Sequence, residues 1–297
     1  MMNTRNFLIA MISILGSVAS YAQPNLLNAN KPSEIGIKSA AQLISDNDKP
    51  LEYGYVDDRD VLMGKTVWEI VDLSERINFP LYFPIDTANI GSDRRSLYDV
   101  LTKGIRSGKI SEVYSDSYFN TKKSFKDIQA SLTRIDTTDA GREQLNAGQA
   151  ISPEYIVKSD LTAQDVTQYK IKGYWYFDKR QSELKYRLLG ICPITPDVYT
   201  MNSEEKDYIE LFWVFFPAAR EVLHGAKAFN DKNSAMPVSF DQILNSRRFN
   251  AVIYQEENVY GDRAITSYMK DNSQNQLLEA ERVKDKIRDF EEDMWNY

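Results

Sequence analysis

The sequence predicts a mixed α+β fold built around an antiparallel meander sheet. Two stretches, near 169–177 and 184–192, alternate large apolar residues with polar ones at a period of two, which is typical of strands with one buried face. The connection "DKRQSE" between them is short enough to join antiparallel neighbours. A third stretch, near 208–216, is apolar on both faces and predicts a central strand. Segments with helical spacing surround these strands, and the last of them ends the chain.

The first 22 residues have the pattern of a secretory signal peptide. Arg5 precedes an apolar run that is too short to span a bilayer, and Ser20 and Ala22 occupy the positions that a signal peptidase reads. We expect cleavage after Ala22. No cysteine follows this site, which argues against a lipid anchor of the bacterial lipoprotein type. No other apolar stretch is long enough for a membrane span, so we expect none in the mature chain.

The remaining chain divides by composition into an arm and a globular region. Residues 23–58 are polar and turn-rich and predict an extended arm. Residues 59–297 predict the globular α+β region, and the pattern allows two sub-lobes, 59–118 and 165–297, joined by a polar excursion over 119–164. The excursion has weak periodicity and is expected to be partly helical around "FKDIQASLTRI".

Helices and one short strand are expected in the first half of the globular region. Val67, Ile70 and Val71 recur at helical spacing and predict a helix that stops before Pro80. The following "PLYFP" predicts a short strand between prolines. A second helix is expected after Ser96, which has the N-cap position of a capping box with an acid three residues on.

The two alternating stretches predict a hairpin with one apolar and one basic face. The apolar face pairs Phe177 with Leu184, and a regular register continues this pairing through Trp175–Tyr186, Gly173–Leu188 and Ile171–Gly190. The other face places Arg187 near Tyr174 and Lys185 near Tyr176, which suits cation–π contact. We call this face the basic-aromatic stripe and take it as a candidate protein-contact or intramolecular surface, formed by Lys170, Lys172, Tyr174, Tyr176, Lys185 and Arg187.

The C-terminal segment "NQLLEAERVKDKIRDFEEDMWNY" predicts an amphipathic helix. Its apolar residues recur at spacings of three and four, while its other faces are rich in charge. The pattern does not decide between docking on its own domain and docking on a partner. Its candidate contact residues are Ile287, Phe290, Met294 and Trp295.

Composition excludes several classes of function. The formal net charge is −7, so the chain lacks the basic footprint of a nucleic-acid-binding protein. Cys192 is the only cysteine and His224 the only histidine, too few for an intrachain disulfide or a structural zinc site. The residues around His224 show no nucleophile motif. The acidic runs "SDNDKP" and "VDDRDV" do not have the EF-hand spacing and indicate solvated turns. We therefore expect no catalytic residues, no metal and no cofactor.

Several long motifs resemble a known family. The stretches "YKIKGYWYFDKRQSELKYRLLGICPI", "FWVFFPAAR", "VYGDRAITSYMKDN" and "EEDMW", together with "WEIVDLSERINFPLYFP" and "RRSLYDVL", are similar to the gliding-motility family GldN and its relative PorN. The resemblance extends from about Val61 to Trp295. It implies a periplasmic component of the type IX secretion system of Bacteroidetes-type bacteria, peripheral to the outer membrane.

The resemblance also implies partners. Members of the family associate with an outer-membrane lipoprotein, GldK or PorK, and with further copies of themselves in a ring, near the motor proteins GldL and GldM. It carries no catalytic residues over to this chain. The first expected function is therefore a non-enzymatic structural subunit of the secretion and gliding machinery. The alternative is a secreted carbohydrate-binding or carbohydrate-active protein that stacks sugars on Tyr174, Trp175 and Tyr176.

Overall fold

The computed structural model describes residues 48–86, 94–150, 152–200, 203, 206–230, 238–270 and 272–295. The elements below belong to one compact unit, Pro50–Thr87 with Arg94–Tyr297. The expected signal peptide and most of the expected arm lie outside the described residues. The α+β class, the antiparallel meander-like sheet and the C-terminal helix are confirmed.

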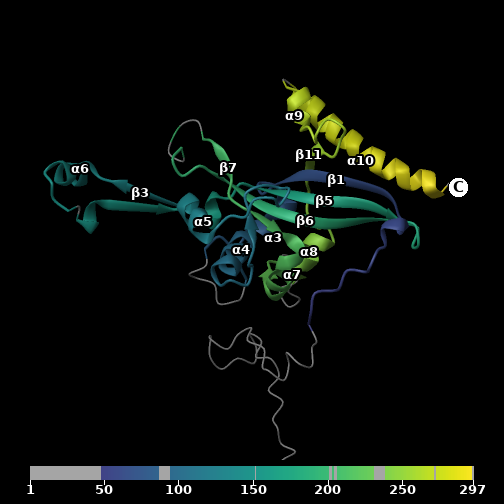
Figure 1. Ribbon diagram of the computed structural model, residues 1–297, viewed down its shortest axis with the longest axis horizontal. Coiled ribbons are helices and arrows are strands. Elements are labelled where there is room, and N and C mark those ends of the chain that lie inside the picture. The colour runs from purple at the N-terminus through teal and green to yellow at the C-terminus, as the bar shows by residue number, and fades with distance from the viewer. Residues whose placement is uncertain are drawn as a thin grey trace, which may run out of the picture. The chain divides into compact units, whose positions relative to one another are not determined.

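The main sheet is antiparallel and, within the described residues, has seven strands (Figure 1). Its order is β11-β1-β5-β6-β8-β2, and β7 also pairs with β6. The long strands β1, β5 and β6 form its centre, and two two-stranded sheets, β9–β10 and β3–β4, lie outside it. The strands are β1 Val61–Asp72, β2 Val113–Tyr114, β3 Thr133–Thr137, β4 Ile156–Asp160, β5 Gln168–Asp178, β6 Glu183–Pro196, β7 Tyr208–Glu210, β8 Trp213–Phe215, β9 Lys227–Ala228, β10 Val238–Ser239 and β11 Val252–Glu256.

Helices cover the sheet in two groups. The shorter helices α4, α7 and α8 contribute to the largest apolar cluster, while α10 packs in a second cluster beside β11. Figure 1 shows α10 along the upper side of the sheet and α7 and α8 below it. The helices are α3 Phe79–Tyr82, α4 Leu97–Arg106, α5 Phe125–Leu132, α6 Asp139–Asn146, α7 Phe216–Gly225, α8 Phe240–Asn245, α9 Ile265–Tyr268 and α10 Ser273–Trp295.

The helix expected around Val67 is wrong, because this segment forms β1. Val67, Trp68 and Glu69 are all buried, so both faces of the strand are covered. A strand buried on both faces reads as a continuous apolar run, which also satisfies a helical pattern. β1 pairs along its length with β5 and, over residues 67–70 in its second half, with β11. Segments 59–118 and 165–297 thus contribute strands to the same sheet.

The short strand expected at "PLYFP" is also wrong, because Pro80 lies in the first turn of α3. Proline suits that position, where its missing N–H would have no helical partner. The turn before it is held by Asn78, whose side chain donates to the carbonyl of Asp72 at 2.7 Å and accepts from the amide of Asn250 at 2.8 Å. The capped helix at Ser96 is confirmed, since its hydroxyl accepts from the amide of Asp99.

The hairpin register is correct for three of the four expected pairs. Phe177–Leu184, Trp175–Tyr186 and Gly173–Leu188 are confirmed, but Ile171 pairs with Ile191 instead of Gly190. A bulge inserts one extra residue into β6, which reverses the faces beyond it. Cys192 consequently joins a cluster with Trp68 and Trp213 on the other face.

The single strand expected near 208–216 is divided. β7 and β8 are separated by Leu211 and Phe212, and the chain enters α7 at Phe216. Pro217 in the first turn of α7 favours this early end. Trp213 and Val214 point to opposite faces and are both buried, so this part of the sheet is covered on both sides as expected.

Candidate functional site

Two of the three lysines of the basic-aromatic stripe, Lys170 and Lys172, have partners on neighbouring segments of the chain. Lys172 Nζ lies 4.9 Å from the ring centre of Trp68 and 4.7 Å from that of Tyr118, and it donates to the carbonyl of Ser117 at 3.0 Å. Burial lowers the pKa of Lys172, against the opposing effect of nearby acids. Lys170 Nζ lies 2.7 Å from Glu210 Oε1. Lys172 therefore stabilises the loop that contains Ser117 and Tyr118. Lys170 stabilises the neighbouring strand β7, which contains Glu210.

Arg187 binds the segment that precedes β1. We call residues 50–56 the strap. The Tyr53 ring lies between two guanidinium groups, with Arg187 Cζ 4.5 Å and Arg220 Cζ 4.1 Å from its centre. Its hydroxyl donates to Asn245 at 2.8 Å, and Arg187 donates to the carbonyl of Gly54 at 3.3 Å. The strap is therefore attached to the hairpin and to α7 and α8 mainly through side chains.

The rings of the hairpin do not form one exposed platform. Tyr174 and Tyr176 stack with ring centres 6.0 Å apart, but Tyr176 is buried. Trp175 packs in the cluster with α10, on the other face of β5. Lys185 Nζ forms an ion pair with Asp178 Oδ2 at 3.3 Å. Both residues line a small cavity of about 270 Å³ beneath the strap. The stacking surface of the carbohydrate alternative thus has no support.

Helix α10 packs on the sheet through the middle of its length. Ala280, Val283 and Ile287 are buried against β11 and β1. Phe290 is half-buried, with its ring centre 6.1 Å from that of Phe177, and Met294 is also half-buried. The side chain of Trp295 lies outside the described part of the structure. The helix therefore docks on its own sheet, and its last turns retain partly exposed apolar side chains.

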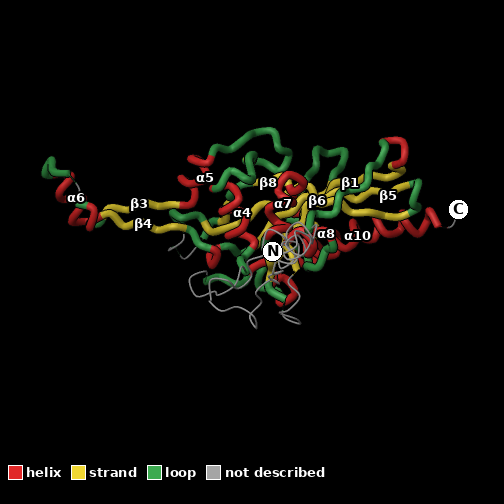
Figure 2. Tube along the Cα trace, turned by 90° about the horizontal axis from the view of Figure 1, so that it is seen from below, coloured by secondary structure: helices red, strands yellow, loops and turns green. Residues whose placement is uncertain are grey.

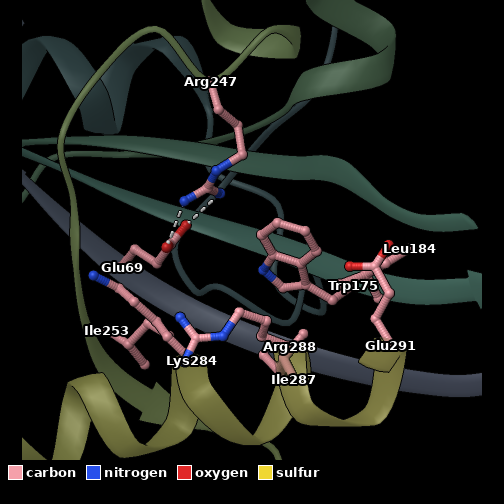
Figure 3. Close-up of a pocket in the computed structure, with 9 residues that line it drawn as sticks. All are labelled: Glu69, Trp175, Leu184, Arg247, Ile253, Lys284, Ile287, Arg288 and Glu291. Carbon is pink, nitrogen blue, oxygen red and sulfur yellow. Dashed lines mark hydrogen bonds and ion pairs between the residues drawn. The ribbon is translucent and has the colours of Figure 1, made fainter. Parts of the chain in front are cut away.

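A cavity of about 360 Å³ lies between α10 and the β5–β6 hairpin. Figure 3 shows Lys284, Arg288 and Glu291 rising from α10 toward the strands. Lys284 is paired with Glu281 at 2.9 Å along the helix. The apolar lining comes from both the strands and the helix, and the charged lining contains three cations and two acids. The lining residues are Glu69, Trp175, Leu184, Arg247, Ile253, Lys284, Ile287, Arg288 and Glu291.

The inner wall of this cavity is a buried ion pair that sequence reasoning did not find. Arg247 donates to both oxygens of Glu69, at 2.8 and 2.9 Å, and Glu69 is 1% exposed. The Arg247 guanidinium also lies 4.1 Å from the ring centre of Tyr186. Burial raises the pKa of Tyr186 well above its usual value, and the negative charge of Glu69 adds to this effect. Because Glu69 and Arg247 form an ion pair with each other, the geometry favours a structural role for both.

The lone cysteine and histidine do not form a reactive pair. Cys192 is fully buried, and burial raises the pKa of its thiol well above the ordinary value. His224 lies near the end of α7, whose last residue is Gly225. Among the described residues, no group of three or more His, Cys, Asp or Glu could hold a metal. In the same part of the chain, no helix has both the length and the apolar character needed to cross a membrane.

These features define an α+β protein with an antiparallel main sheet and a C-terminal helix docked on that sheet. The family model described as "Gliding motility associated protein GldN" matches residues 56–296. The chain therefore belongs to the GldN family, whose members are structural components of the gliding and type IX secretion machinery. A comparison with curated proteins gave no match.

Proposed function

We propose that the protein is a non-enzymatic structural subunit that builds a periplasmic ring with an outer-membrane lipoprotein of the GldK/PorK type. The ring would lie near the periplasmic part of the GldL/GldM motor. Membership of the GldN family supports a role in this machinery. The observation that carries the contact proposal is the cavity beside α10, which combines apolar side chains with a charged rim.

The cavity has the anatomy of a contact site for another protein. Protein interfaces combine an apolar centre, often with aromatic residues and arginine, with a polar rim. Here Trp175 and Ile287 supply the apolar part, and Arg288, which is well exposed, lies at the rim. Phe290 and Met294 continue the apolar surface along the same helix. We assign this surface to the lipoprotein partner.

Charge reversal at the rim tests this assignment. Arg288→Glu is expected to lower the amount of GldK/PorK that co-isolates with the protein from native envelopes, because a rim charge influences partner association. The matched control is Lys286→Glu on the same helix, since Lys286 is exposed and does not line the cavity. Both purified variants should melt like the parent. Equal partner recovery for Arg288→Glu and Lys286→Glu would remove the cavity as the contact site.

The basic-aromatic stripe is a second proposed contact surface, but a partner would have to share or replace its internal contacts. Reversing Lys185 and Arg187 to Glu removes the Asp178 pairing and the strap contacts. We therefore expect the strap to loosen as well as any partner contact to weaken. Limited proteolysis within 50–56 reports the first effect, and co-isolation reports the second. A variant with a protected strap and weakened co-isolation would identify a direct contact.

The proposed periplasmic location rests on the expected signal peptide. We propose that the mature chain begins at Gln23 and lies in the periplasm, peripheral to the outer membrane. N-terminal sequencing of the protein from fractionated cells checks this proposal. Retention of residues 1–22, acylation of the protein, or recovery in the cytoplasmic fraction would contradict it.

A further inference from the structure

The polar excursion contains a two-stranded ribbon that pairs with nothing else in the described chain. β3 and β4 run antiparallel over five residue pairs without a shift in register, and α6 lies at the tip (Figure 2). The end strands β11 and β2 of the main sheet are different, because neighbouring segments bridge them at Gln255–Ala264 and Tyr114–Lys122. An isolated two-stranded ribbon is at best marginally stable in water.

The backbone hydrogen bonds at the two ends of the ribbon show which groups face outward. Leu161 N–H donates to the carbonyl of Leu132 at 2.8 Å, and Thr138 N–H donates to that of Tyr155 at 2.9 Å. These flanking pairs have the same register as β3 and β4, and hydrogen-bonded pairs alternate with non-hydrogen-bonded pairs in an antiparallel ladder. The residues at 133, 135 and 137, and at 156, 158 and 160, therefore direct their backbone groups away from the ribbon.

Two of these outward N–H groups have acceptors nearby, and the others form two short open edges. Thr133 N–H donates to Gln129 O at the end of α5, and Ile156 N–H donates to Pro153 O. By the register, the other outward N–H groups are those of residues 135 and 137 on β3 and of residues 158 and 160 on β4. Within the described chain, neither strand contains proline or a bulge, which proteins commonly use to protect an exposed edge.

We infer that the β3 edge of one copy pairs with the β4 edge of a second copy of this chain. The two edges match in length and in number of open N–H groups, and strand addition at open edges is a common mode of recognition. A symmetric contact of β3 with β3 would leave each β4 edge open. Pairing β3 with β4 uses both edges of every copy and keeps all strands antiparallel. Such a head-to-tail contact builds a ring or a filament.

This inference deepens the self-association part of the proposed function, but its test uses only the purified full-length mature chain. Proline at position 135 or 158 removes an outward N–H and leaves the internal ladder of the ribbon in place, because neither N–H takes part in that ladder. We expect the parent to form oligomers in sedimentation velocity over a concentration series. We expect Ile135→Pro and Lys158→Pro each to stay monomeric at concentrations where the parent forms oligomers.

Mixing the two proline variants gives the decisive result. Each variant retains the edge that the other lacks, so a mixture should form dimers and nothing larger, while each variant alone should stay monomeric. Leu145→Asp, at the exposed tip in α6, is the control and should assemble like the parent. A monomeric parent at every concentration overturns the inference. Loss of assembly in only one of the two proline variants also overturns it, because that result indicates symmetric pairing.

A second pair of variants protects the test against misfolding. Thr137→Pro and Asp160→Pro remove the other outward N–H groups and should repeat the results of the first pair. Limited proteolysis of the ribbon and circular dichroism establish that each variant is folded. Folded proline variants that assemble like the parent contradict the inference. The co-isolation experiment with the lipoprotein is independent, so the ring proposal and the ribbon inference can fail separately.

Discussion

The Arg247 guanidinium makes a two-pronged contact with the Glu69 carboxylate, although the two residues lie 178 positions apart in the chain. Glu69 is on the central strand β1, and Arg247 follows α8 with a positive φ of 49°. The contact joins the sheet to the loop after α8 at the inner wall of the α10 cavity. A buried pair of this kind is most sensitive to the loss of one partner.

Replacing Arg247 alone should therefore be costly. Arg247→Met leaves the carboxylate of Glu69 buried without its cation, and we expect a loss of about 3–5 kcal/mol in the free energy of unfolding. The double variant Glu69→Met with Arg247→Met removes both charges and should be more stable than the single variant. Urea unfolding monitored by tryptophan fluorescence measures both. A single variant that loses less than about 1 kcal/mol would show that the pair is not sealed from water.

Tyr53 should control the attachment of the strap. Tyr53→Phe keeps the ring between Arg187 and Arg220 and loses only the hydrogen bond to Asn245, at a cost of about 1 kcal/mol. Tyr53→Ala also loses the two cation–π contacts, each worth about 0.5–2 kcal/mol. Hydrogen exchange in residues 50–56 should thus rise slightly for Phe and strongly for Ala. Equal exchange in the two variants would exclude a role for the ring.

The middle of α10 should contribute measurably to the stability of the lone chain. Val283 is fully buried on the sheet, so Val283→Ala should lower the free energy of unfolding by about 1.5–3 kcal/mol. Leu278→Ala is the control, because Leu278 is 68% exposed on the same helix and its change should stay within about 0.5 kcal/mol. Thermal melting of both variants distinguishes them. A silent Val283→Ala would indicate that α10 docks on the sheet only in an assembly.

Alkaline pH should weaken the fold through Tyr98. Burial raises the pKa of Tyr98 to about 12 from the ordinary value of 10.0. Above pH 10 the unfolded chain releases this proton while the folded chain keeps it, so the stabilisation is complete below pH 10 and is lost as pH rises to about 12. The loss amounts to about 3 kcal/mol at most. The free energy of unfolding, measured as a function of pH, should fall less steeply for Tyr98→Phe than for the parent. An unchanged slope would contradict the prediction.

Local signals predicted the elements that depend on neighbouring residues. The cap at Ser96, the alternation in β5 and β6, and the helical spacing of α10 all appear in the structure. β1 could not be recognised in this way, because burial of both faces removes the period of two. The bulge in β6 was also missed, since it depends on the strands packed beside it.

The candidate surfaces were predicted in position but not in their contacts. The sequence placed cations and rings on one face of the hairpin, and that face contains them. It could not show that Tyr53 covers Arg187 or that Tyr118 covers Lys172, because these partners lie 134 and 54 positions away. The cavity beside α10 was missed for the same reason, as its walls come from β1, β5, β6, the loop after α8, β11 and α10.

The position of β1 at the centre of the sheet determines when the protein can fold. β1 is the first strand of the described chain to be synthesised, yet Val67 pairs with Gly173 on one side and with Glu256 on the other. Contacts between such distant segments slow folding, because long loops must close before the pairing is rewarded. Until β11 is synthesised, one edge of β1 stays unpaired, and Trp68 lacks its packing neighbours on β11. The chain therefore completes its sheet only near the end of its synthesis, and a truncated chain exposes a long apolar strand that is prone to aggregation.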